Sequence, residues 1–117
     1  MSDPLLELRR GESKEWSFTA SQGAEPVDLT NASLTFTLRE TFADKFATLQ
    51  KTVGNGITVT DDTAGKFILA LEPEDTKNIP IRADKRIFVW DVWGVLASGK
   101  EKSVARGTLE LSPEVTR

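Results

Sequence analysis

Residues 54–71 read Gly54-Asn55-Gly56-Ile57-Thr58-Val59-Thr60-Asp61-Asp62-Thr63-Ala64-Gly65-Lys66-Phe67-Ile68-Leu69-Ala70-Leu71, and this stretch decides the fold class. Large apolar residues recur at every second position, at Ile57 and Val59 in the first half and at Phe67, Leu69 and Leu71 in the second. Such alternation is typical of β-strands that bury one face. Glycine, asparagine and aspartate between the halves supply turn chemistry. The stretch therefore predicts a β-hairpin.

The same alternation extends in both directions from this hairpin. It is clearest in residues 14–19, 34–38, 87–93 and 102–111. Turn residues separate these segments at intervals of roughly 10 residues, which is the spacing of a β-sandwich. Residues 72–78 are the expected exception, a single helical turn with proline and acids first and lysine last. We therefore expect an all-β, antiparallel sandwich of about 7–9 strands in one domain spanning residues 1–117.

Composition excludes several classes of function. The chain has 117 residues, a formal net charge of -3, no cysteine and no histidine. A domain of this size can fold without disulfides, and its charge gives no footprint for nucleic acid or an anionic membrane. We also expect no signal peptide at the N-terminus and no membrane span. Without histidine, Ser-His-Asp sites and histidine zinc sites are impossible, so binding is expected rather than catalysis.

We expect no cofactor and no metal ion. Asp61, Asp62 and Asp75 could suggest calcium, which takes oxygen ligands. Their spacing matches no calcium-binding loop, and acids beside glycine are ordinary turn residues. Asp91 and Arg106 are expected to pair across the last two strands as a structural ion pair.

Several segments, taken in order, carry a family resemblance. They are Pro26-Val27-Asp28-Leu29, Leu34-Thr35-Phe36-Thr37-Leu38-Arg39, the 54–71 hairpin, Trp90-Asp91-Val92 and Arg106-Gly107-Thr108-Leu109. Together they resemble the immunoglobulin-like domains of tailed-bacteriophage virion proteins. The pattern is similar to the N-terminal immunoglobulin-like domain of upper baseplate proteins and to small stand-alone phage proteins. The resemblance covers nearly the whole chain.

The resemblance implies an immunoglobulin-like sandwich that is a structural or adaptor component of the virion, in the tail, baseplate, neck or head. Such a protein is made in the bacterial cytoplasm and ends in the particle. Its partners would be other virion proteins, bound in multiple copies set by the symmetry of the particle. A carbohydrate-binding or host-surface adhesion module is the alternative.

Two irregular segments interrupt the strand pattern and are candidates for partner contact. Residues 40–46 hold Phe42 and Phe46, whose spacing would place them on one face of a helical turn. They either cap the end of the sandwich or form an apolar binding knob. Residues 79–85 are a long loop that carries Arg82 and Lys85. All four side chains are candidate interface residues.

Trp93 is the fifth candidate interface residue. If Phe88, Trp90 and Val92 face the core, Trp93 points outward together with Ile87 and Val89. An outward tryptophan can anchor a protein interface or stack on a sugar ring. It would instead be core if the strand were covered on both sides. We favour core or a subunit interface over sugar binding.

Overall fold

The computed structural model describes residues 5–22, 25–41, 47–79 and 86–113. Four of the candidate interface residues, Phe42, Phe46, Arg82 and Lys85, lie outside these ranges. The described chain is all-β with one short helix, as the sequence predicts. The elements are β1 (Leu5–Arg9), β2 (Lys14–Thr19), β3 (Ser21–Gln22), β4 (Glu25–Pro26), β5 (Ser33–Arg39), β6 (Leu49–Val53), β7 (Gly56–Asp61), β8 (Lys66–Leu71), α1 (Pro73–Thr76), β9 (Arg86–Val95) and β10 (Glu101–Ser112).

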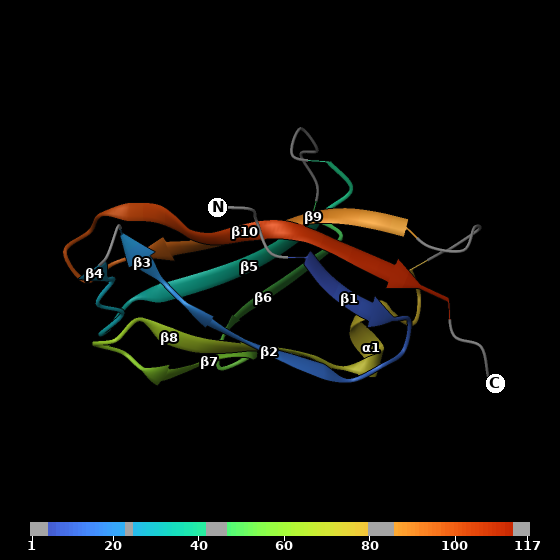
Figure 1. The fold of residues 1–117 in the computed structure, drawn as a ribbon, viewed down its shortest axis with the longest axis horizontal. Coiled ribbons are helices and arrows are strands. Elements are labelled where there is room, and N and C mark those ends of the chain that lie inside the picture. The colour runs from blue at the N-terminus through green and yellow to red at the C-terminus, as the bar shows by residue number, and fades with distance from the viewer. Residues whose placement is uncertain (1–4, 23–24, 42–46, 80–85, 114–117) are drawn as a thin grey trace.

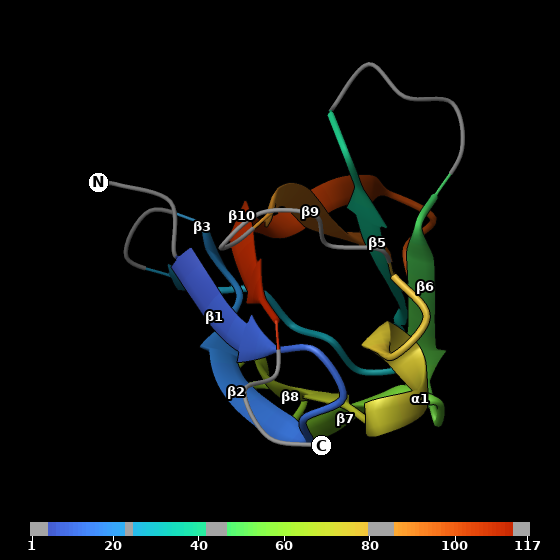
Figure 2. The same cartoon turned by 90° about the vertical axis from the view of Figure 1, so that its right-hand side faces the viewer.

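The strands form an elongated sandwich, with extents of 45 × 27 × 25 Å (Figure 1). Eight of them are hydrogen-bonded in the order β1-β10-β9-β5-β6-β7-β8-β2, and β3 and β4 form a separate small ribbon. Seen along the long axis, the eight strands surround a common interior (Figure 2). One layer is β1-β10-β9-β5-β6 and the other is β7-β8-β2. The link between the layers is the short contact of β6 with β7.

The pairing is that of the immunoglobulin fold. There, the second, fifth and fourth strands lie in one sheet, and the third, sixth and seventh lie in the other. With β6 as an added strand, β2-β8-β7 and β5-β9-β10 take these places. The all-β class is confirmed, and most pairs are antiparallel. The exceptions are β1 with β10 and the two-residue contact of β6 with β7, which are parallel.

Alternation along the strands supplies the core. Phe36 and Leu38 of β5 and Phe88, Trp90 and Val92 of β9 are fully or almost fully buried. The Trp90 indole Nε1 donates a 2.9 Å hydrogen bond to the Thr108 carbonyl oxygen, which satisfies its polar atom inside the core. Its ring packs beside Phe18 and Phe36, with centroids 5.4 and 5.8 Å away. Trp16 of β2 is half-buried and packs against this core.

The hairpin of β7 and β8 forms as the sequence predicts, with Ile57 opposite Leu69 and Val59 opposite Phe67. It turns through Gly65, which has a φ of 71°. A Cβ there would lie 2.5 Å from the Ala20 carbonyl oxygen and 2.7 Å from that of Val27. Glycine is required at this position both for its backbone angle and for the close approach of two other segments.

The predicted helical turn is present as α1 and closes one end of the sandwich. Asp75 accepts a 2.7 Å hydrogen bond from the Glu72 amide through Oδ2, and its Oδ1 lies 2.7 Å from the Lys51 ammonium. Both partners of this ion pair have side chains only 11% exposed. Thr76 is buried and accepts a hydrogen bond from the Gly11 amide through Oγ1. These contacts join α1 to β6 and to the turn after β1. Among the described residues, no helix is long and apolar enough to span a membrane.

Candidate functional site

The outer surface of the β1-β10-β9-β5-β6 layer is the candidate binding site, and we call it the β9 face. Because Phe88, Trp90 and Val92 point into the core, the intervening residues of β9 point outward. Trp93 therefore lies outside with Ile87 and Val89, as the sequence predicts, and is 43% exposed. The alternative that both sides of β9 are covered is wrong at Trp93.

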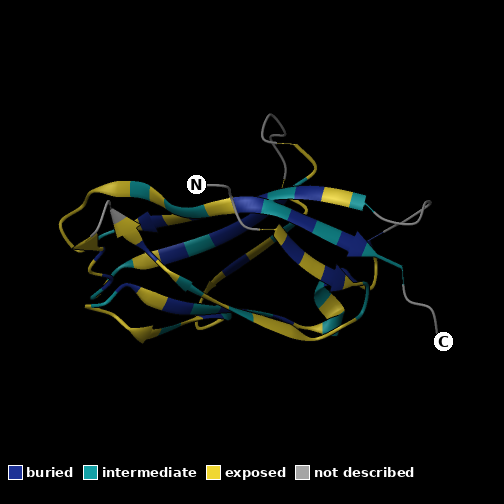
Figure 3. Ribbon diagram, in the orientation of Figure 1, coloured by how far each residue is buried: buried dark blue, intermediate teal, exposed yellow. Residues whose placement is uncertain are grey.

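Exposed apolar residues gather on the β9 face. Five large apolar side chains in the described ranges are exposed: Leu5, Val53, Ile87, Trp93 and Val95. Three of these belong to β9, and Leu5 lies on the same side because it pairs with Thr108, whose other neighbour is Val89. The alternation of exposed and buried positions along β9 and β10 can be followed in Figure 3. Clustered exposed apolar area of this kind marks interaction sites.

The outer surface of the opposite layer is different. Its exposed positions carry polar or charged side chains, Glu15 and Ser17 on β2, Thr58 and Thr60 on β7 and Lys66 on β8. The large residues Phe67, Leu69 and Leu71 of β8 point inward, whereas Ile68 and Ala70 point outward and are only half-buried. The two faces of the sandwich are thus unequal, and among the described residues only the β9 face combines exposed large apolar side chains with polar groups.

Trp93 is held in place by a hydrogen bond. Its indole Nε1 donates to Glu101 Oε1 at 3.0 Å. In the register of the sheet, Ser103 and Thr35 flank Trp93, and Thr52 follows Thr35. The aromatic ring therefore belongs to a row of three hydroxyl side chains across the layer. Period-two alternation identified Trp93, but Glu101 is not recognisable from sequence because its role depends on the strand register.

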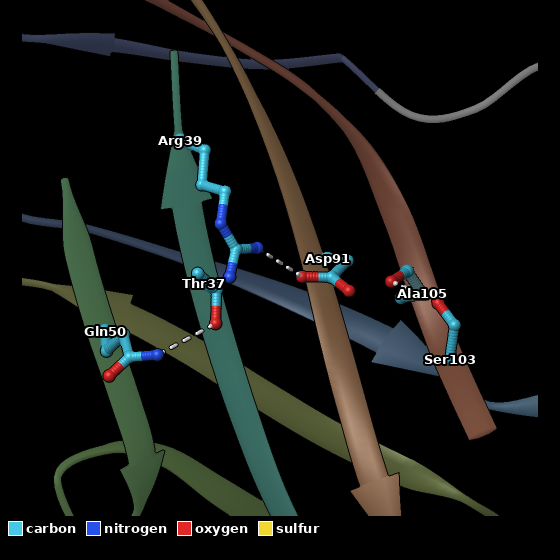
Figure 4. A network of polar contacts seen from close by, with 6 residues as sticks. All are labelled: Thr37, Arg39, Gln50, Asp91, Ser103 and Ala105. Carbon is cyan, nitrogen blue, oxygen red and sulfur yellow. Dashed lines mark hydrogen bonds and ion pairs between the residues drawn. The ribbon is translucent and has the colours of Figure 1, made fainter. Parts of the chain in front are cut away.

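A polar network lies next to this row, in the middle of the β9 face (Figure 4). Arg39 Nη1 is 4.0 Å from Asp91 Oδ1, and Gln50 Nε2 donates to Thr37 Oγ1 at 3.4 Å. Thr37 is buried although it points outward. Burial raises the pKa of the Asp91 carboxyl above its ordinary value of 3.8, and the positive charge of Arg39 opposes that rise.

The network gives Asp91 a partner that the sequence did not predict. The structure pairs Asp91 with Arg39 of β5, while Arg106 lies directly opposite Asp91 in the register of β10. A central strand has a neighbour on each side, and spacing along the chain does not reveal that β5 brings a second cation beside Asp91. Arg39 and Thr37 are therefore members of the face that sequence reasoning missed.

The described acidic residues form no group of three or more that could hold a metal ion. Asp61 and Asp62 accept hydrogen bonds from the turn that follows them, from Thr63 and Ala64. Asp75 is occupied by Lys51 and by the start of α1. Each of the three carboxylates thus has a structural role, and the three are not brought together.

Comparison with known proteins assigns no family. No family model matches the chain, and no curated protein matches it. Among solved structures, one similar chain is AggA, the major subunit of aggregative adherence fimbriae type I from Escherichia coli. The two are 11% identical, with a TM-score of 0.30, over 97% of this chain and 92% of AggA.

Proposed function

We propose that this chain is a structural or adaptor protein that binds another protein through the β9 face. The observation that carries the proposal is the gathering of exposed apolar side chains on one sheet face. Protein interfaces combine an apolar centre containing aromatic residues with a polar rim. Trp93, Ile87 and Val95 would supply the apolar groups. Glu101, Arg39 and Gln50 would supply the polar groups.

The setting we propose is a tailed-phage virion, on the strength of the sequence resemblance to virion immunoglobulin-like domains. A sandwich with one binding face is well suited to a symmetric assembly, because the same contact is repeated in every copy and the copies together bind with avidity. Mass spectrometry of purified phage particles tests the setting. The proposal expects the chain in the particle at a fixed ratio to capsid or tail proteins. Its absence from washed particles would count against the virion.

Carbohydrate binding is the second candidate, favoured by Trp93 and its row of hydroxyl side chains. An exposed aromatic ring can stack on a sugar, and hydroxyl groups can bond its hydroxyls. A glycan array separates the two candidates. Binding to a defined glycan that is lost in Trp93→Ala supports the second function. An array without binding, together with a protein partner that loses affinity in the same variant, supports the first.

A further inference from the structure

A groove of about 700 Å³ lies at the end of the sandwich where β3, β4 and the β9–β10 hairpin meet. We call it the loop-end groove. It is bordered by residues 25–28, 30 and 31 on one side and by residues 96–98, 100 and 102 on the other. Neither Trp93 nor Ile87 lines it, so it is separate from the β9 face. Its apolar lining comes from Pro26, Val27, Leu96 and Ala97.

The two sides of the loop-end groove carry opposite charges. Glu25 and Asp28 border it from β4 and the segment that follows, and Lys100 and Lys102 border it from the hairpin. Asp28 is held by Thr30, whose amide and hydroxyl donate hydrogen bonds of 2.9 and 2.6 Å to its Oδ1. These bonds lower the pKa of Asp28, so its carboxylate is charged at neutral pH. An occupant of the groove meets negative charge on one side and positive charge on the other.

The residues that line the loop-end groove restrict the chemical class of molecule that can bind in it. The described residues that border the groove include no aromatic ring on which a sugar could stack. Two lysines opposed by two carboxylates do not attract a polyanion. Aliphatic lining between opposite charges is instead complementary to a polypeptide that presents an aliphatic side chain between a basic and an acidic one.

We propose that the loop-end groove binds such a segment of a partner protein, with the basic residue of the partner beside Glu25 and Asp28 and its acidic residue beside Lys100. This second surface goes beyond the binding proposed for the β9 face. It would make the module bivalent, so that one sandwich connects two partners and gains avidity from both contacts.

A selection from a random library of 12-residue peptides, displayed against the immobilised full chain, tests the proposal. Enriched peptides are expected to contain an aliphatic residue flanked by residues of opposite charge. Amide shifts in an NMR titration with the best peptide should cluster in residues 25–31 and 96–102. Lys100→Glu should weaken its binding about fivefold, as should Glu25→Lys, since attraction becomes repulsion at an exposed site.

The controls are Lys66→Glu and Glu15→Lys, which make the same charge changes on the opposite layer and should leave binding unchanged. A repeat selection against Lys100→Glu should enrich a basic residue in place of the acidic one. The proposal would be overturned if the selection enriched no peptide or enriched peptides without the aliphatic–charge pattern. It would also be overturned if the amide shifts centred on another surface, or if all variants bound the peptide with equal affinity. Trp93→Ser removes the exposed aromatic ring of the β9 face and changes no residue that lines the groove. It should weaken binding at the β9 face and leave peptide binding at the groove unchanged, so the two proposals are tested separately.

Discussion

The Trp93 indole Nε1 donates a 3.0 Å hydrogen bond to Glu101 Oε1, which ties the largest exposed side chain of β9 to the first residue of β10. The bond links the two strands beside the loop that joins them and limits the orientations of the ring. A pre-oriented aromatic side chain loses less conformational entropy when a partner covers it. This relationship makes Trp93 the natural centre of a contact on the β9 face.

Replacing Trp93 with serine should therefore separate binding from stability. An exposed side chain contributes little to the folded state, so the free energy of unfolding should change by less than about 1 kcal/mol. Loss of a central interface tryptophan should weaken partner binding about 30-fold or more. Urea unfolding and the amount of chain incorporated into particles measure the two effects. Ile68→Ser on the opposite layer is the control and should leave incorporation intact.

Lys51→Met should destabilise the protein markedly. The change leaves the Asp75 carboxylate at a site where its side chain is only 11% exposed, without its ammonium partner. Removing one member of a buried ion pair costs about 3–5 kcal/mol. Urea unfolding of this variant should be compared with that of Lys66→Met, in which the lysine is exposed. A loss below about 1 kcal/mol would show that Lys51 does not hold α1 against β6.

Gly65→Ala and Gly99→Ala form a matched pair. Both glycines have positive φ, 71° and 90°, so alanine is strained at each by about 1–2 kcal/mol. Only at Gly65 would the added Cβ also meet backbone oxygens, whereas nothing lies within 4 Å of it at Gly99. Thermal unfolding should show a larger loss for Gly65→Ala, by roughly 2 kcal/mol or more. Equal losses would mean that the segments around Gly65 can move apart.

Asp91→Asn should change how stability depends on pH. The folded pKa of Asp91 is raised, so the folded state holds this proton more tightly than the unfolded state. Its contribution to stability is therefore lost as pH rises from the unfolded value near 3.8 through the higher folded value. The asparagine variant lacks this loss. Relative to wild type, it should be more stable at pH 7 than at pH 3.

Urea unfolding at pH 3, 5 and 7 measures this effect. Glu15→Gln is the control, because it removes one negative charge, as Asp91→Asn does, but at an exposed position. Its effect on stability is subtracted to remove the general effect of net charge. A difference between Asp91→Asn and wild type that is the same at all three values would contradict the account of the Arg39–Asp91 network.

Strand pattern predicted the fold far better than it predicted the polar contacts. Alternation located the β7–β8 hairpin, the inward Phe88 and Trp90 and the outward Trp93, because each follows from local period alone. Lys51 gave no such signal, since its partner Asp75 is brought to it by the path of the chain through β7 and β8. The Arg39–Asp91 pairing depends in the same way on which strands become neighbours, which no local pattern encodes.

A reconstruction of the assembled phage particle at side-chain resolution tests the central proposal most directly. We predict that the chain is present and that Trp93, Ile87 and Val95 are buried against another subunit, together with Glu101 and Arg39. A particle in which the chain is present but the β9 face is open to solvent, or from which the chain is absent, would contradict the account.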